Sequence, residues 1–238
     1  MKKIKNTRDG HHLNSKYWQN YKKTLPEMPQ ELLDIAIGML LGDASIYKVS
    51  HHAYLKFEQG YKQQEFLEHL FLKFQRYCFM ESPGKRYKLP QGDLKSFWFK
   101  TFSHPSLTPL FSLFYPKNTR KKQVWSGLVR DYLTAQGFCY WVMCDGSLQK
   151  NRKTLILHSQ GFSKQENQVL SDELNAKFQL HSRVLSHKHK YFVLEIPFQD
   201  AAIVSALLKP YVLLSFKYKF PGMEKKSIEE NVSNKLMT

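Results

Sequence analysis

The chain has 238 residues, 42% of them hydrophobic and 14% aromatic, which is typical of a globular protein with one large core or two smaller ones. Lys and Arg outnumber Asp and Glu by 36 to 20, a formal net charge of +16 at pH 7, so we expect a polyanionic partner. The sequence contains no run of about 18 apolar residues and its N-terminus is charged, which excludes a spanning helix and a secretory signal. These properties predict a soluble, intracellular protein that binds nucleic acid, with an anionic membrane surface as the second candidate.

The three cysteines, Cys78, Cys139 and Cys144, all fall in apolar stretches and form no Cys-x-x-Cys pair. An odd number of cysteines without metal-ligand spacing predicts reduced thiols in the core rather than disulfides or a zinc site. We expect them to contribute to packing only.

The first block of predicted elements follows a basic N-terminal segment at 1–28 and occupies residues 29–115. Residues 31–42 are apolar on nearly every face, which predicts a buried helix, and the alternation in 53–59 predicts a half-buried strand. A second helix, a pair of strands around a Pro-Gln-Gly-Asp turn and a closing helix are expected at 63–79, 84–102 and 106–114. The apolar stripe of the second helix consists of Phe66, Leu67, Leu70, Phe71, Phe74 and Cys78.

The second block repeats this order after a basic, turn-rich linker at 116–130, and a short tail at 222–238 follows it. Within the block, at 131–221, Thr134 is positioned to cap a buried helix that ends near Cys144. A strand, a helix, a hairpin and a closing helix are expected at 153–160, 164–178, 182–196 and 200–214. The chain is therefore predicted to be an α+β protein of two pseudo-symmetric αββαββα halves.

Two pairs of similar stretches support the duplication. The heptapeptide QGYKQQE at 59–65 returns as QGFSKQE at 160–166, 101 residues later. In the stretches AIGMLLGDASI and FCYWVMCDGSL an aspartate, Asp43 or Asp145, occupies the equivalent position, and these two aspartates are 102 residues apart. Two markers at nearly one spacing indicate a repeated unit.

Both aspartates follow an apolar helix, at the end where the helix dipole is negative and backbone carbonyls lack partners. A carboxylate at this end needs a cation, and carboxylate and carbonyl oxygens are the ligands that Mg²⁺ prefers. We expect the two buried helices to pack against each other, with Gly38 and Gly42 allowing a close approach that brings the aspartates side by side. The simpler alternative is that Gly-Asp and Asp-Gly only end helices as turn residues; duplication in register favours the metal site.

These motifs resemble the paired motifs of the LAGLIDADG homing endonuclease family, in its single-chain form with two repeats and in particular its omega-intron type. The resemblance rests on AIGMLLGDA, its copy FCYWVMCDG, and the later stretches LLKPY and YKFP, and covers residues 14–221. The second copy departs from the family pattern with Tyr140 at a usually small position and Cys144 before the aspartate. The family implies halves packed through the paired motif helices, a saddle-shaped antiparallel sheet surface for DNA, and a monomer that cuts both strands.

The resemblance also implies the metal site. Asp43 and Asp145 are matched to the metal ligands, helped by the backbone carbonyls of Gly42 and Cys144. The implied cofactor is Mg²⁺, for which Mn²⁺ substitutes, whereas Ca²⁺ binds without supporting cleavage.

Four further residues are matched to the family's active site. One lysine per half is implied, Lys122 in TRKKQV and Lys219 in YKFP, and the neighbouring Lys121 is a near-equal alternative to Lys122. A polar residue at the end of the first long strand, Glu58 in one half and Ser159 in the other, is matched to the position that holds water or phosphate. Because these two residues differ chemically, the two DNA strands are expected to be cut at unequal rates.

DNA recognition is expected from the exposed faces of the predicted strands, which would lie along the major groove. Most contacts should go to phosphates and only a few to bases. The candidate DNA-binding residues are Lys48, Tyr54, Lys56, Lys85, Arg86, Lys88, Lys95, Lys100, Lys150, Arg152, Lys153, His158, Gln160, Arg183, Lys188 and Lys190.

Three other functions remain open at this stage. The first is an RNA-binding intron maturase on the same fold, and the second is a DNA-binding regulator that does not cleave. The third, of a different class, is an adaptor for an anionic membrane or ribosomal RNA in which the repeat is only structural. If the gene lies in an intron, an organellar location such as the mitochondrion is expected.

Overall fold

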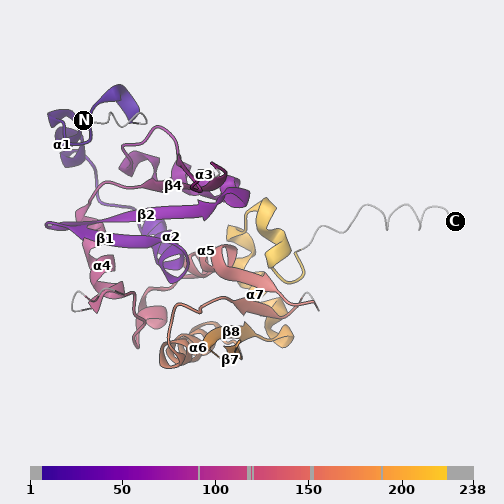
Figure 1. Cartoon of the computed structure of the whole chain (residues 1–238). Helices are drawn as coiled ribbons and strands as arrows, with labels where there is room; N and C mark the ends of the chain where they lie inside the picture. Colours follow the sequence, from indigo (N-terminus) through magenta and orange to yellow (C-terminus); the bar gives the residue numbers. More distant parts are fainter. Residues whose placement is uncertain are drawn as a thin grey trace. The chain divides into compact units, whose positions relative to one another are not determined.

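The computed structural model describes residues 7–90, 92–116, 119, 121–150, 153–188 and 190–223. The chain divides into two compact units, Met1–Gln123 and Val124–Thr238 (Figure 1). In the described residues, each unit contains one antiparallel sheet of four strands. The predicted α+β class with two similar halves is confirmed.

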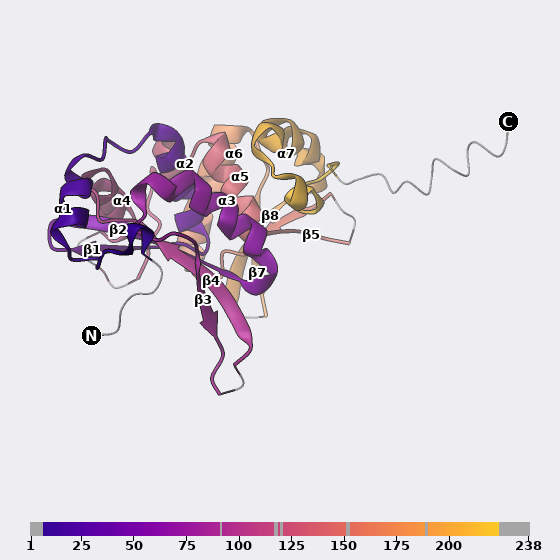
Figure 2. The same cartoon turned by 90° about the horizontal axis from the view of Figure 1, so that it is seen from above.

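The first sheet has the order β1-β2-β4-β3. Its strands are β1 (Ser45–Val49), β2 (His52–Gly60), β3 (Gly84–Tyr87) and β4 (Leu94–Lys100). Figure 2 shows β3 and β4 as a hairpin that extends away from the rest of this unit. In β2 the side chains of Leu55 and Phe57 are fully buried, and those of Tyr54, Lys56 and Glu58 are partly exposed, which confirms the predicted alternation.

The helices of the first unit are α1 (Lys16–Lys23), α2 (Gln30–Leu41), α3 (Gln64–Phe74) and α4 (Thr108–Phe114). Helix α2 is the predicted buried motif helix, and α3 packs on β2 and β4. The predicted stripe of α3 is buried from Phe66 to Phe74, but Cys78 lies beyond the helix. A 3-10 turn, Gln75–Tyr77, ends the helix, and Cys78 is extended and pairs with Thr101, so its placement on the stripe was wrong.

The basic N-terminal segment contains a helix that was not predicted. Ser15 caps α1, because its hydroxyl oxygen accepts a hydrogen bond from the Trp18 N–H. The Trp18 ring is fully buried, and the Arg8 guanidinium lies 5.4 Å from its centroid. Trp18 is the one buried residue of this helix, so the basic stretch around it shows no repeating pattern of apolar residues that would predict a helix.

The second unit repeats the arrangement with shorter strands, in the order β5-β6-β8-β7. Its elements are α5 (Ala135–Asp145), β5 (Gly146–Leu148), β6 (Leu155–Leu157), α6 (Lys164–Phe178), β7 (Arg183–His187), β8 (Tyr191–Ile196) and α7 (Ala201–Leu208). Thr134 caps α5 as predicted, with its hydroxyl accepting from the Gly137 N–H. Helix α6 agrees with the predicted 164–178, because Ser163 and Glu166 form a complete capping box.

Two second-unit elements are shorter than predicted. Strand β6 stops at Leu157 because the buried Asn167 amide donates to the carbonyl oxygens of Ser159 and Phe162 and holds the chain in a turn. Helix α7 stops at Leu208 and a 3-10 turn follows, since Pro210 has no N–H to continue the helix.

Two further predictions concern the whole chain. Within the described residues no helix has the length and apolar character needed to cross a membrane. The thiols of Cys78, Cys139 and Cys144 are buried, and no disulfide forms among the described residues. Burial raises the pKa of Cys78 and of Cys139 far above the ordinary thiol value, so both are protonated packing groups.

Candidate active-site halves

The first half of the candidate site is the C-terminal end of α2. The Gly42 N–H donates to the Gly38 carbonyl oxygen at 3.3 Å, and the Ala44 N–H donates to the Met39 carbonyl oxygen at 2.8 Å. These bonds end the helix and satisfy two of its terminal carbonyls. Asp43 lies between the two capping residues with its side chain exposed. The predicted position of this aspartate at the negative end of a helix is confirmed.

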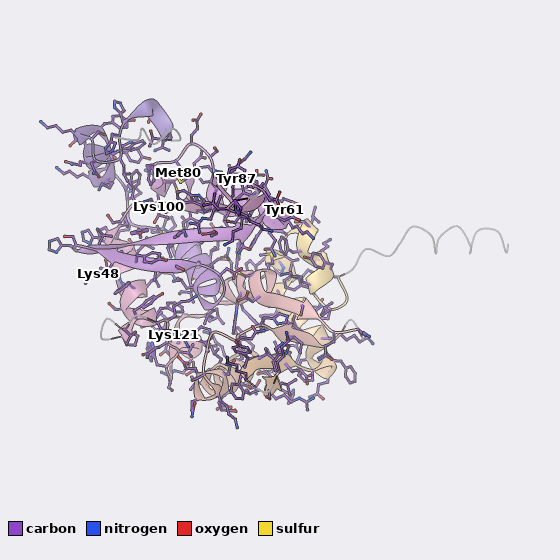
Figure 3. All side chains as sticks on the ribbon, in the orientation of Figure 1. Lys48, Tyr61, Met80, Tyr87, Lys100 and Lys121 are labelled. Carbon is purple, nitrogen blue, oxygen red and sulfur yellow. The ribbon has the colours of Figure 1, made fainter. Side chains whose placement is uncertain are left out.

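A lysine near the C-terminal end of the same unit donates hydrogen bonds to backbone carbonyls at this helix end. The Lys122 ammonium donates to the carbonyl oxygens of Leu40, Gly42 and Ala44 at 2.7, 2.8 and 3.1 Å. An ammonium has three N–H donors, so these bonds occupy all of them. The neighbouring Lys121 is exposed instead (Figure 3), so Lys122 is the lysine at this half-site.

The second unit has the same arrangement. Helix α5 ends at Asp145 itself, whose side chain is half-buried. The Lys219 ammonium donates to the carbonyl oxygens of Met143 and Cys144 at 2.6 and 3.1 Å, and only 8% of this lysine is exposed. Lys219 also lies 5.5 Å from the centroid of the Phe216 ring. In both units, therefore, a lysine ammonium lies against the backbone directly before the aspartate.

A carboxylate at the negative end of a helix is stabilised by a nearby cation, and these lysines supply that positive charge. Each ammonium lies where the helix dipole is negative, which favours a cation. The carbonyls of Gly42 and Cys144, which were matched to metal ligands, both accept from a lysine. A carbonyl oxygen has two lone pairs and can accept a second partner, but a nearby ammonium repels a cation. The carboxylates of Asp43 and Asp145 are therefore the stronger candidates for metal ligands.

The residue beside Asp43 is Gln59 rather than the predicted Glu58. The Gln59 amide donates to the Asp43 Oδ2 at 3.2 Å, and its side chain is buried. Glu58 points to the opposite face of β2, where it accepts from Lys56 and Ser96 at 2.7 Å each. The alternation of the strand contained this signal, because Gln59 shares the parity of the buried Phe57.

In the second unit, Ser159 is a structural residue of the turn after β6. Its side chain is buried and its hydroxyl donates to the Asn167 Oδ1. The backbone N–H of His158 donates to the backbone carbonyl oxygen of Asp145 at 2.9 Å, and the His158 Nε2 is 2.8 Å from the Ser147 hydroxyl. Burial lowers the pKa of His158, helped by nearby His187 and Lys219, so the ring is neutral at pH 7.

A hollow adjoins the second half-site. It has a volume of about 520 Å³ and is bordered by β5, by the following Gln149 and Lys150, and by Tyr218 and Lys219. Its lining carries two lysines beside the residue that follows Asp145, which suits an anion such as a phosphodiester.

Gly146 is required by the way α5 ends. A Cβ at this position would overlap the Val142 carbonyl oxygen and crowd the Val142 side chain. We expect Gly146→Ala to lower the free energy of unfolding by about 1–3 kcal/mol, since either the helix end or the strand must shift. Gly161→Ala is the matched control, because nothing lies within 4 Å of a Cβ there. Urea unfolding of both variants measures the difference, and equal stability would contradict the steric argument.

The outward face of the first sheet carries part of the predicted DNA surface. Tyr54, Lys56, Arg86 and Lys100 are on this face by the strand register. The Lys100 ammonium (Figure 3) lies 5.6 Å from the centroid of the Tyr54 ring, which stacks on Tyr47 at 5.4 Å. Lys88 is exposed in the turn between β3 and β4.

Three predicted DNA contacts point away from that face. Lys48 pairs with the buried Ala53 and Lys85 pairs with the buried Phe97, so both lie on the side of the sheet that bears the core. Lys95 is two residues before Phe97 and shares that side. The expectation that they share the outward face with Tyr54 and Lys56 is therefore wrong, because successive side chains of a strand point to opposite faces.

In the second unit, His158 and Arg183 are on the outward face of the sheet, and the Gln160 amide lies 3.3 Å from the His158 Nδ1. The remaining candidates of this unit are exposed residues in the two loops between strands, Lys150, Lys153, Lys188 and Lys190. Arg152 lies outside the described residues.

The comparisons with known proteins agree with this geometry. The model of the LAGLIDADG DNA endonuclease family matches residues 33–203, well over half of the chain. The chain belongs to this family. A probable intron-encoded DNA endonuclease 3 of Mycosarcoma maydis is 45% identical over 55% of the chain and 96% of its own length. A probable intron-encoded endonuclease 1 of Wickerhamomyces canadensis is 31% identical over 87% of the chain and 90% of its own length.

Among solved structures, this LAGLIDADG protein resembles the homing endonuclease I-WcaI bound to its DNA recognition sequence. The TM-score is 0.78 at 30% sequence identity, and the match covers 88% of the chain and 94% of I-WcaI. The family assignment and the fold expected from the two motifs are confirmed.

Proposed function

We propose that the protein is a site-specific homing endonuclease that makes a double-strand break in a long DNA target, with one half-site serving each strand. The observation that carries the proposal is the duplicated arrangement of an aspartate and an anchored lysine at the end of a motif helix. The likeness to a homing endonuclease bound to its DNA recognition sequence supports DNA as the substrate. The net charge of +16 suits a polyanionic duplex.

The donor set fits a hard divalent cation such as Mg²⁺. An exposed Asp43 carboxylate and a half-buried Asp145 carboxylate offer the oxygen ligands that Mg²⁺ prefers. A divalent cation held there would lower the pKa of an attacking water and neutralise charge on the scissile phosphate. Lys122 and Lys219 act as positioning residues that fix the backbone before each aspartate, and the Gln59 amide orients the Asp43 carboxylate.

A single chain carries both half-sites, so we propose that a monomer cuts both strands. The half-sites are not identical: α2 ends two residues before the exposed Asp43, whereas α5 ends at the half-buried Asp145 itself. This difference supports unequal cleavage rates for the two strands.

The proposal is tested by incubating purified full-length protein with a randomised library of double-stranded DNA, in Mg²⁺ or in Ca²⁺, and sequencing the cut ends. We expect one family of related sites to be cut in Mg²⁺ and none in Ca²⁺, since Ca²⁺ occupies oxygen sites without the strict octahedral geometry of Mg²⁺. Mn²⁺ should replace Mg²⁺. Salt-sensitive DNA binding without any cut in Mg²⁺ or Mn²⁺ would contradict the endonuclease and favour a DNA-binding regulator.

An RNA maturase is the second candidate. The cytochrome b mRNA maturase bI2 of Saccharomyces cerevisiae is 26% identical over 87% of this chain, and the match spans about half, 51%, of that maturase. Binding of intron RNA with a specificity equal to that for DNA would favour this function.

The location is also a proposal. Two of the relatives are named intron-encoded endonucleases of fungi, which supports an intron-encoded protein that acts in an organelle such as the mitochondrion.

A further inference from the structure

Each sheet presents an arginine of an edge strand that is held by a glutamate on the same outward face. In the first unit the Arg86 Nη1 lies 3.1 Å from the Glu58 Oε1. In the second unit the Arg183 Nε and Nη2 lie 2.7 and 2.5 Å from the Glu195 Oε1. Strands β3 and β7, which carry the arginines, occupy the same edge position in the two sheets. The arginine position is duplicated, whereas the glutamates come from different strands, Glu58 from β2 and Glu195 from β8.

The glutamates are fully engaged with the protein. Glu58 also accepts from the Lys56 ammonium and the Ser96 hydroxyl, each at 2.7 Å. Burial raises the pKa of Glu58, but the hydrogen bonds from Lys56 and Ser96 and the charge of Arg86 outweigh it, so the pKa is lowered and the carboxylate is ionised. Glu195 is buried, with 6% of its surface exposed, and also accepts from the Gln149 amide at 3.3 Å. Neither carboxylate is placed to act on a ligand directly.

The arginines, in contrast, remain available on the surface. The side chains of Arg86 and Arg183 are 46% and 67% exposed, against 23% and 8% for their glutamate partners. A guanidinium has five N–H donors in one plane, and each glutamate occupies only one edge of that plane. The plane is thereby fixed while another edge stays open for a second partner.

We infer that Arg86 and Arg183 read guanine bases in the major groove, one in each half of the target, with Glu58 and Glu195 as positioning residues. This inference rests on the proposed DNA function. A phosphate contact needs only positive charge, and a neighbouring carboxylate would weaken it by repelling the phosphate. Guanine recognition instead needs a guanidinium plane set to donate two parallel hydrogen bonds to the guanine O6 and N7, which a fixed arginine provides.

The test is a comparison of base preference. Wild-type protein in Ca²⁺ first selects its preferred duplex from a randomised pool, and its affinity is then measured for every single-base-pair variant of that duplex. Arg86→Ala should reduce discrimination at one G·C pair by about 5- to 150-fold, the range for a bidentate contact, and Arg183→Ala should do so at a different G·C pair. Arg86→Lys, which keeps the charge, should lose the same discrimination.

Two further variants separate reading from charge. Glu58→Gln should reduce discrimination at the same pair as Arg86→Ala while raising affinity for unrelated DNA, because one negative charge is removed. Lys85→Ala is the matched control on the opposite face of the same strand and should leave the preference unchanged. Thermal unfolding of each variant confirms that it is folded.

Two outcomes would overturn the inference alone. Uniform weakening by Arg86→Ala at all base pairs, with a salt dependence lower by about one phosphate contact, would make Arg86 a phosphate ligand. An effect of Glu58→Gln at a pair other than that of Arg86→Ala would make the glutamate itself the reader. If the wild type selects no sequence at all, the proposed function fails and the inference fails with it.

Discussion

Asp145→Asn should convert the protein into an enzyme that nicks one strand of its target. The substitution keeps the size of the side chain but removes the charge that would hold a divalent cation, so cleavage of the strand served by this half-site should fall by at least about a hundredfold. Asp43→Asn should affect the other strand, and the double variant should cut neither. The measurement is single-turnover cleavage of a duplex with a different dye on each strand, resolved on a denaturing gel.

The control for charge is Asp172→Asn on an exposed position of α6, whose carboxylate accepts from the Gln168 amide. It should cut both strands at the wild-type rate. Equal loss of both strands from one aspartate substitution would show that the half-sites do not act independently. Full cleavage by the double variant would be incompatible with an aspartate-based endonuclease.

Lys219→Met should lower both stability and cleavage. The buried ammonium satisfies the Met143 and Cys144 carbonyls, and losing it should reduce the free energy of unfolding by about 1–3 kcal/mol. Cleavage of one strand should fall by about 10- to 100-fold, the usual range for residues that orient metal ligands. Lys122→Met should have the corresponding effect on the other strand, since Lys122 holds the backbone around Asp43.

Matched controls are available next to each lysine in the sequence. Lys121→Met and Lys217→Met remove the same charge from an exposed and a half-buried side chain, and both should remain close to wild type. Rates are measured at a temperature where every variant is folded, and DNA affinity is measured separately in Ca²⁺. If the lysine variants are less stable but cleave DNA at the wild-type rate at that temperature, the lysines only cap the helices and have no role in cleavage.

The sequence predicted those elements whose signals are local. Helix α6 was placed correctly because Ser163 and Glu166 mark its start by themselves. Strand β6 was predicted too long because its end depends on the side chain of Asn167, which acts from the following helix. Helix α1 was missed because its stability comes from Trp18 and its contacts with the rest of the unit.

The candidate site shows the same division. The two aspartates were found from a motif and its repeat, and their helix-end position followed from the apolar run before them. The carbonyl partners of Lys122 could not be predicted, because 82 residues separate it from Leu40. The alternation in β2 places Gln59 on the same face as the buried Phe57 and Glu58 on the opposite face. The resemblance pointed to Glu58, but the hydrogen bond to Asp43 comes from Gln59.

The lysine anchors also affect when each half-site can exist during synthesis. Lys122 is the second-last residue of the first unit, and Lys219 follows Cys144 by 75 residues. Each half-site therefore joins an early helix to a residue that leaves the ribosome late, across a long closed loop. A chain that stops before the lysine lacks this anchor, so we expect the half-site to reach its full cleavage rate only after its unit is complete.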